Sequence, residues 1–283
     1  MSTLSKSASQ THPAPRRVGI LVLPQFSNLG LALVIEPMAI ANWLSQRTLY
    51  EWTVLSIDGE PVQATNGMIA PTRPVSNETG EFSTIFVVAS FEPKKHAKNR
   101  KVKAWLRRES VFGAQIGGIE TGTEMLAAAS LLDGRPAAVH WDNLEGFQEA
   151  YPNVKATTQL YTIEPRLITC AGGSAIIDMM LEWIGQHAGT ELSAEISQHL
   201  LHARIRGTSE VQLARTDLDA APMNEQVSEA IRLMQESVAA PVSCEELAAA
   251  VGLSKRQLER QFKQYTATAP LRYYVSLRLA TAH

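Results

Sequence analysis

Cysteine is scarce in this sequence: only Cys170 and Cys244 occur among 283 residues. Two thiols so far apart cannot supply a disulfide framework or a zinc cluster, and they fit a reducing cytoplasm. Long apolar runs are missing as well, since no stretch approaches the roughly 18 apolar residues of a membrane span and the first residues lack the apolar core of a signal peptide. We therefore expect a cytoplasmic protein with no membrane partner, no metal and no cofactor.

An overall positive charge is also absent. The chain has 26 Lys and Arg residues against 28 Asp and Glu residues, a formal net charge of -2, which at face value argues against a nucleic-acid-binding protein. The average hides an asymmetry, because the residues from Pro241 onward include six basic and three acidic side chains. A basic C-terminal end on an acidic body is typical of a DNA-binding appendage, since phosphate attraction needs only local positive charge.

Apolar runs alternate with stretches of helical spacing through most of the chain. Buried strands are predicted at residues 18–23, 52–57, 84–89 and 114–119. Helices are predicted at residues 28–44, 102–108, 121–132 and 174–187. Because the strand segments lack a clean apolar and polar alternation, the pattern predicts an α/β fold in which helices cover both faces of a parallel sheet.

Length and composition predict two domains of unequal size. At 283 residues and 45% hydrophobic content, the chain has material for one large core and one small one. A polar, turn-rich stretch containing Asp217, Asp219 and Pro222 favours a linker. The expected division is a disordered tail (1–16), a large α/β domain (17–207), a linker (208–224) and a small all-α domain (225–283).

The strongest motif lies between residues 243 and 264. Ser243 and Glu246 have the spacing of a capping box at a helix start, and Ser254 can cap a second helix. Between these helices, Ala248 is small enough for a close helix crossing and Gly252 suits a left-handed turn residue. Together with an apolar position at Leu258, this spacing predicts a DNA-binding helix-turn-helix.

The outward face of the second helix carries the candidate DNA-binding residues. They are Lys255, Arg256, Gln257, Arg260, Lys263 and Gln264. Arginine and glutamine near the helix start can contact base edges, whereas Lys263 is better placed for a phosphate. The alternative is an ordinary helical hairpin with a solvated basic face, but the coincidence of small residue, glycine turn, caps and basic face favours DNA binding.

This part of the chain resembles the AraC/XylS family of transcription regulators. The resemblance rests on the pattern from Ser254 to Lys263 and on the Ala269–Pro270, Tyr273–Tyr274 and Arg278–Leu279 pairs. It implies two helix-turn-helix units joined by a long helix, and residues 270–283 look like that joining helix. The sequence stops there, so we expect an incomplete DNA-binding domain, from a truncated chain or a one-headed variant.

A second motif, Gly118-Ile-Glu-Thr-Gly122, follows a predicted strand and opens a predicted helix. In a nucleophile elbow, glycines at these positions permit a strained turn that exposes the side chain between them, here that of Glu120. The elbow, residues 18–24, Ile35–Pro37, His140–Trp141 and residues 170–174 together resemble the class I glutamine amidotransferase-like superfamily, in its intracellular-protease-like branch, over most of residues 17–190.

That resemblance implies a flavodoxin-like sheet and a lost catalytic centre. Catalytic relatives carry cysteine at the elbow, and Glu120 cannot form a thioester, so we expect no catalytic residue. The fusion to an AraC-type module resembles regulators that sense nitrogenous metabolites such as betaines, carnitine or arginine. Ligands of open α/β sheets bind at the carboxyl ends of the strands, which places six candidates in a pocket: Glu36, Ser90, Phe91, Glu120, His140 and Trp141.

Carboxylates beside aromatic rings suit a small cationic or amino-acid-like metabolite. Alternatively, Phe91 and Trp141 belong to the core and Glu36 is hydrogen-bonded to the elbow backbone. The leading functional prediction is a ligand-responsive transcription regulator that works as a homodimer, because a single DNA-binding head reads only one half-site. Two alternatives stay open: an amidohydrolase or hydratase using Glu120 with His140 or Glu36, and an interaction module with a vestigial DNA-binding head.

Overall fold

The chain forms two compact units, which are described separately. The computed structural model describes residues 14–75, 80–212, 225–238, 241–266 and 269–281. The first unit ends at Gln212 and the second begins at Leu213. The predicted tail is described only from residue 14, and the predicted linker only as far as residue 212.

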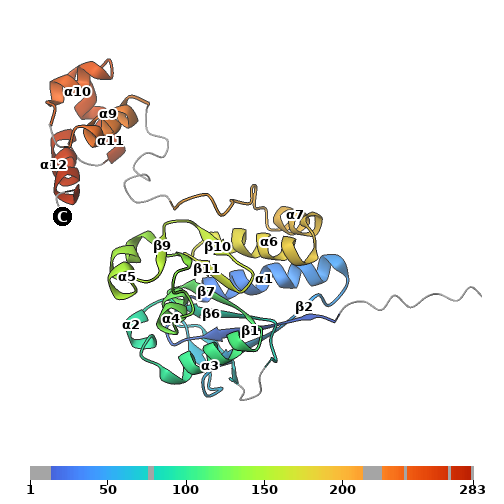
Figure 1. The fold of residues 1–283 in the computed structure, drawn as a ribbon. Helices are drawn as coiled ribbons and strands as arrows, with labels where there is room; N and C mark the ends of the chain where they lie inside the picture. Colours follow the sequence, from blue (N-terminus) through green and yellow to red (C-terminus); the bar gives the residue numbers. More distant parts are fainter. Residues whose placement is uncertain (1–13, 76–79, 213–224, 239–240, 267–268, 282–283) are drawn as a thin grey trace, which may run out of the picture. The chain divides into compact units, whose positions relative to one another are not determined.

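A seven-stranded sheet forms the centre of the first unit (Figure 1). All neighbouring strands are parallel except β10, which pairs antiparallel with β11. The strands in spatial order are β10 (Tyr161–Ile163), β11 (Leu167–Cys170), β7 (Gln115–Glu120), β6 (Thr84–Ala89), β1 (Arg16–Val22), β2 (Tyr50–Ser56) and β5 (Arg73–Pro74). Two small two-stranded sheets accompany it, β3 (Val62–Gln63) with β4 (Ile69–Ala70) and β8 (Pro136–Ala138) with β9 (Lys155–Thr157).

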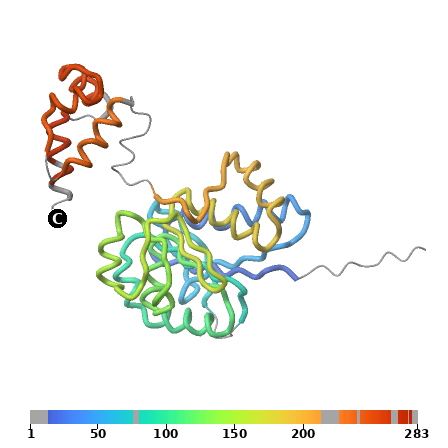
Figure 2. The backbone as a smooth tube through the Cα atoms, turned by 45° about the horizontal axis from the view of Figure 1, so that its top comes forward, coloured from blue at the N-terminus to red at the C-terminus, as the bar shows by residue number. Residues whose placement is uncertain are grey.

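Helices cover both faces of the central sheet, as Figures 1 and 2 show. On one face lie α1 (Asn28–Ser45), α6 (Ala175–Ala188) and α7 (Thr190–His199). On the other lie α2 (Pro93–His96), α3 (Arg100–Val111) and α4 (Gly122–Ala128). A short 3-10 helix, η1 (Trp141–Asn143), leads into α5 (Leu144–Ala150). The predicted flavodoxin-like α/β fold is confirmed.

The burial of strand β6 explains why its sequence does not alternate between apolar and polar residues. All six of its residues are buried. Phe86 and Val88 belong to the apolar cluster beneath α1 and α6, whereas Ile85 and Val87 belong to the cluster beneath α3 and α4. A central strand covered by helices on both sides must be apolar on both faces.

The second unit contains the predicted helix-turn-helix. Its helices are α9 (Glu225–Glu236), α10 (Cys244–Ala250), α11 (Lys255–Thr266) and α12 (Pro270–Thr281). The capping box of α10 is present: the Glu246 backbone N–H donates to Ser243 Oγ at 3.2 Å, and the Ser243 N–H donates to Glu246 Oε2 at 2.7 Å. Gly252 makes the turn with a φ of 69°.

A buried apolar cluster joins the described helices of this unit. Its members include Val227 and Ile231 of α9, Leu247 of α10, Phe262 of α11 and Tyr274 of α12. The Tyr274 hydroxyl also donates to the Ser237 carbonyl oxygen at 3.0 Å, which fastens α12 to the end of α9. The helix α12, which lies in the segment predicted to resemble a joining helix, is therefore part of this core.

Two predicted boundaries differ from the structure. The strand β1 already begins at Arg16, inside the predicted tail. At the other end, residues 208–212 were expected to be linker, but Glu210 O accepts from Leu160 N–H at 3.1 Å and Gln212 N–H donates to Thr158 O at 2.8 Å. These pairings extend the first unit by five residues, which polar composition alone could not reveal.

Asp178 fastens the segment that follows α7. The Asp178 carboxylate is fully buried and accepts hydrogen bonds from His202 Nε2 at 2.8 Å, from the Arg206 backbone N–H at 2.7 Å and from Arg206 Nη2 at 2.6 Å. A buried carboxylate is tolerated because these donors replace the water it loses.

Asp178→Ala is expected to destabilise the first unit by about 3 kcal/mol, because it leaves the Arg206 guanidinium without its carboxylate. All five tryptophans precede residue 213, so tryptophan fluorescence during urea unfolding reports on this unit alone. The control is Arg204→Ala, which breaks the exposed Arg204–Glu210 ion pair and should change stability by less than about 1 kcal/mol. Equal losses in both variants would contradict a special role for Asp178.

Candidate ligand pocket and DNA-binding surface

The turn between β7 and α4 has the predicted elbow geometry. Glu120 adopts a left-handed backbone conformation with a φ of 55°. A Cβ at Gly122 would lie 2.0 Å from the Val87 carbonyl oxygen, and one at Gly118 would lie 2.6 Å from the Thr123 Cα. Both glycines are therefore required by direct backbone approach, and the strained residue between them projects its side chain above the strand ends.

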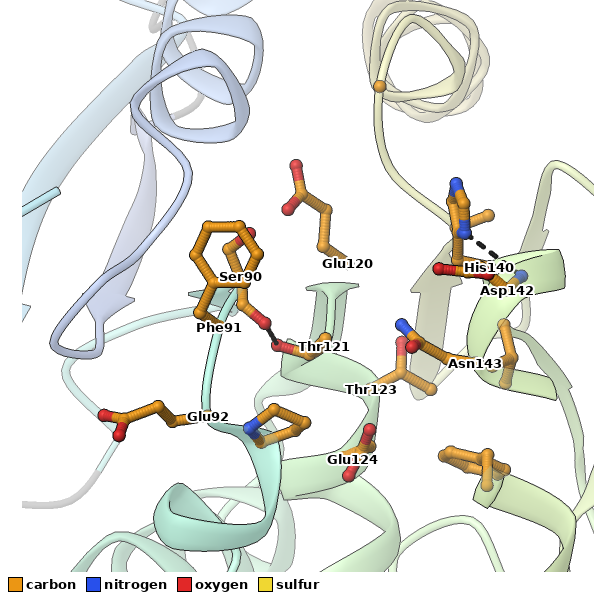
Figure 3. Close-up of a pocket in the computed structure, with 15 residues that line it drawn as sticks. Ser90, Phe91, Glu92, Glu120, Thr121, Thr123, Glu124, His140, Asp142 and Asn143 are labelled. Carbon is orange, nitrogen blue, oxygen red and sulfur yellow. Dashed lines mark hydrogen bonds between the residues drawn. The ribbon is translucent and has the colours of Figure 1, made fainter. Parts of the chain in front are cut away.

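A pocket of about 380 Å³ surrounds this side chain (Figure 3). It is lined by Ser90, Phe91, Glu92, Pro93, Glu120, Thr121, Thr123, Glu124, Val139, His140, Asp142, Asn143, Phe147, Ala171 and Gly173. These residues follow β6, β7, β8 and β11, so the pocket lies at the carboxyl ends of the parallel strands, where open α/β sheets bind ligands.

Among the described residues, four carboxylates line the pocket and no lysine or arginine does. Glu92 is paired with Lys95 at 3.0 Å. Burial raises the pKa of Glu120, an effect opposed by the hydroxyl groups of Ser27 and Ser90 and by His140. Burial also raises the pKa of Glu124 to about 7, opposed by Lys94. Carboxylates whose ionised form is disfavoured by burial gain from a cation that replaces the lost water.

Hydrogen bonds order the rim of the pocket. Thr121 Oγ1 donates to the Ser90 carbonyl oxygen at 2.7 Å and so joins the ends of β6 and β7. Across the pocket, His140 Nδ1 accepts from the Asp142 backbone N–H at 3.3 Å, as the dashed line in Figure 3 shows. The Phe91 ring is 63% exposed at the mouth, which excludes the alternative that Phe91 is a core residue.

The structure brings together four of the six predicted pocket residues: Ser90, Phe91, Glu120 and His140. Glu36 is not among the lining residues and is exposed, because α1 turns Val34 and Met38 toward the sheet and Glu36 away from it. Trp141 is half-buried beside His140, with ring centroids 5.2 Å apart, and does not line the pocket. Both placements correct the sequence-based expectation.

Several lining residues were missed by sequence reasoning. Glu124 lies in the first turn of α4, which begins just after Glu120, and Asp142 and Asn143 follow His140 in η1. Ser27, which caps α1, adds a hydroxyl close to Glu120. Within the described ranges, no group of three His, Cys, Asp or Glu residues has an arrangement that could hold a metal ion.

In the second unit, α11 presents a basic stripe formed by Arg256, Arg260 and Lys263. The spacing of four and three residues places them on one helix face, and all three side chains are exposed. In the part of the chain that the structure describes, none of them forms an ion pair. This stripe is available for phosphates and base edges.

Two other predicted DNA-binding side chains have partners within the protein. Lys255 Nζ donates to Glu245 Oε1 at 2.6 Å. Gln257 Oε1 accepts from the Ser254 backbone N–H at 2.9 Å, so Gln257 completes a second capping box with Ser254. The side chain of Gln264 lies outside the described residues.

Comparison with known proteins assigns the class. No family model matches the chain. The transcriptional regulator CdhR of Pseudomonas aeruginosa, described as HTH-type, is 37% identical over 262 residues, which cover 93% of this chain and 77% of CdhR. The HTH-type transcriptional regulator GbdR of the same species is 36% identical over 283 residues, covering 100% of this chain and 77% of GbdR.

Solved structures share the fold of the first unit. An AraC family transcriptional regulator from Pseudomonas putida has a TM-score of 0.60 at 21% identity, over 66% of this chain and 100% of that structure. DJ-1beta of Drosophila melanogaster has a TM-score of 0.55 at 16% identity, over 66% of this chain and 98% of that structure. The fold and site thus define a DJ-1-like α/β unit followed by a helix-turn-helix unit. The chain belongs to the HTH-type transcriptional regulators.

Gly122→Ala should destabilise the first unit by at least about 3 kcal/mol, because neither the elbow nor the Val87 carbonyl can move without breaking strand pairing. Gly146→Ala is the matched control: an added Cβ meets nothing within 4 Å on α5, so this change should stabilise by roughly 0.5 kcal/mol. Tryptophan fluorescence during urea unfolding measures both. A Gly122→Ala variant as stable as the parent would show that the close approach is not required.

Proposed function

We propose that this protein is a ligand-responsive transcription regulator that binds a small cationic or amino-acid-like metabolite beside Glu120 and binds DNA through α11. The observation that carries the proposal is the charge of the pocket, whose described lining residues include four carboxylates and His140 but no lysine or arginine. The relatives named above are transcriptional regulators, which supports the regulatory role.

The pocket suits a small cation in size and in chemistry. Its volume of about 380 Å³ falls within the range of small-molecule sites. Glu120 and Glu124 are both half-buried lining residues, and either carboxylate could pair with an ammonium group. The exposed Phe91 ring at the mouth could add cation-π attraction. An amino-acid-like ligand would also find an amide donor in Asn143.

The site supports binding better than catalysis. The elbow holds a carboxylate where related folds can hold a nucleophilic thiol, and a carboxylate is a poor nucleophile toward an acyl carbon. An acid and base pair of Glu36 and Glu120 is not supported either, because Glu36 is exposed and does not line the pocket. We therefore propose that the first unit is a sensor and not an enzyme.

DNA binding is assigned to the helix-turn-helix unit. We propose that the protein acts as a homodimer, because pairing of two chains lets their helix-turn-helix units read two half-sites. We further propose that it acts in the cytoplasm, where a bacterial chromosome lies. None of the helices in the described part of the chain combines the length and the apolar character that a membrane crossing requires.

The DNA-binding role predicts different effects for two residues of the basic stripe. Arg256→Ala should lower affinity for the duplex upstream of the protein's own gene by about tenfold and relax sequence preference, since an arginine near the helix start can contact base edges. Lys263→Ala should weaken binding to all duplexes alike. The salt dependence of binding should correspond to the release of about one counterion fewer.

Fluorescence anisotropy over a salt series measures both effects, with Lys98→Ala in the first unit as the control. Salt-independent binding, or no binding at all, by the parent protein would contradict the DNA-binding assignment. Identical behaviour of the two variants would contradict the division between base and phosphate contacts.

The sensor role predicts selective stabilisation by cations. In a thermal-shift panel, choline or arginine should raise the unfolding temperature of the first unit, whereas 3,3-dimethylbutanol, the neutral analogue of choline, should not. Glu120→Gln should weaken binding of the active cation about tenfold or more, since a charged hydrogen-bonding partner is lost. Glu195→Gln, an exposed glutamate of α7, is the control. A flat panel would contradict the cationic ligand.

The same panel has a predicted pH dependence. Since burial raises the pKa of Glu124 from 4.5 to about 7, its contribution to stability is present below about pH 4.5 and is lost as the pH rises through about 7. Cation binding should follow the opposite course and strengthen between about pH 6 and pH 8 as the carboxylate ionises. In Glu124→Gln, the affinity for the cation should increase less over this pH range than it does in the parent. An unchanged profile in Glu124→Gln would contradict a role for Glu124 in binding.

A further inference from the structure

Gln212 is the last described residue of the first unit, and its side-chain amide is bonded at both ends. Its Nε2 donates to the Val139 carbonyl oxygen at 2.8 Å and to the Gln159 carbonyl oxygen at 3.0 Å. Its Oε1 accepts from the Trp141 backbone N–H at 3.0 Å. The amide therefore uses both of its donors and its acceptor on three backbone groups.

Two of these backbone groups flank His140. Val139 and His140 both line the pocket, as do Asp142 and Asn143, which follow Trp141 along the turn. The bonds from Gln212 thus hold the outer side of the same turn whose inner side forms one wall of the pocket. His140 itself is fixed within the turn by the hydrogen bond from the Asp142 N–H.

Backbone pairing joins this contact to the end of the first unit. Gln212 N–H donates to Thr158 O at 2.8 Å, and Val139 N–H donates to Thr157 O at 3.0 Å. The end of β9 therefore lies between the pocket turn and residue 212. From Gln212 the chain continues into the second unit, which begins at Leu213.

We propose that Gln212 is a positioning residue that couples occupancy of the pocket to the chain leading into the DNA-binding unit. The inference rests on the proposed function. A ligand that contacts His140 or Asp142 favours one arrangement of the turn from Val139 to Asn143. A shift of that turn by a fraction of an ångström misaligns the hydrogen bonds at the Val139 carbonyl and the Trp141 N–H together.

Coupling of this kind requires only that the ligand and the Gln212 contact prefer the same arrangement, or opposite ones. The exposed Arg204–Glu210 pair lies in the same segment, and neither of its residues lines the pocket. It therefore provides a control that alters the segment without altering the turn.

The test uses the full chain and its Gln212→Ala and Arg204→Ala variants, with choline as the probe and the duplex upstream of the gene as DNA. Choline should change the DNA affinity of the parent and of Arg204→Ala by about fivefold or more. By calorimetry, the affinity of Gln212→Ala for choline should lie within about threefold of the parent's. Adding choline should nevertheless change the DNA affinity of this variant by less than about twofold. A parent-like response in Gln212→Ala, with choline bound, overturns the proposal.

A ligand-free measurement separates this inference from the proposed function. DNA affinities of Gln212→Ala, His140→Ala and the double variant form a cycle, with Arg204→Ala in place of Gln212→Ala as the control cycle. Non-additivity above about threefold in the first cycle alone supports the coupling, and additivity overturns it. If choline binds no form of the protein, the cationic sensor fails while this cycle still decides the role of Gln212.

A loss of folding in Gln212→Ala would be detected by tryptophan fluorescence. In that case Gln212→Glu replaces it in both measurements. This variant keeps the shape of the side chain and the acceptor for the Trp141 N–H but loses the two donations. It should therefore show the same loss of response, and a parent-like response would overturn the proposal.

Discussion

The close approach of the elbow backbone to β6 is the constraint on which the pocket depends. Because Gly122 meets the Val87 carbonyl and Gly118 meets Thr123, the turn can take one path only, and Glu120 is held at a φ of 55°. The carboxyl ends of β6, β7 and β11 then surround one side chain. Gly172 completes the arrangement, since any Cβ there would lie 2.4 Å from Glu120 Cγ. The loop after β11 is thus shaped around a glutamate.

A device that exposes one strained residue can serve binding as well as catalysis. At an elbow, a thiolate would attack a substrate, whereas a carboxylate offers a fixed negative charge with little conformational freedom to lose on binding. Burial raises the pKa of Glu120 and of Glu124, so each carboxylate is poorly hydrated in the empty pocket. A cation that enters relieves this cost, which is why the same burial that disfavours ionisation favours a charged ligand.

Features set by local backbone requirements could be predicted from the sequence. The elbow glycines, the Ser243 capping box and the Gly252 turn each depend on residues a few positions apart, and the buried β6 run depends only on its own apolar character. Glu36 could not be placed, because its exposure depends on which face of α1 meets the sheet. The Lys255–Glu245 ion pair arises from the crossing of two helices. Gln257 is different, because a Ser three residues before a Gln is the capping-box pattern and was readable.

The two walls of the pocket differ in how firmly the fold holds them. Glu120 and Ser90 follow long central strands whose ends are joined by the Thr121 hydroxyl. His140 and Asp142 follow β8, a three-residue strand in a separate two-stranded sheet, joined to the centre through the Ala138 N–H and Thr169 Oγ1 at 2.7 Å. A ligand bound between a rigid wall and a softer one shifts the softer one, since that wall has the lower cost of rearrangement. Gln212 is bonded to this softer wall. A change in the wall on ligand binding would therefore reach the residue from which the chain continues into the DNA-binding unit.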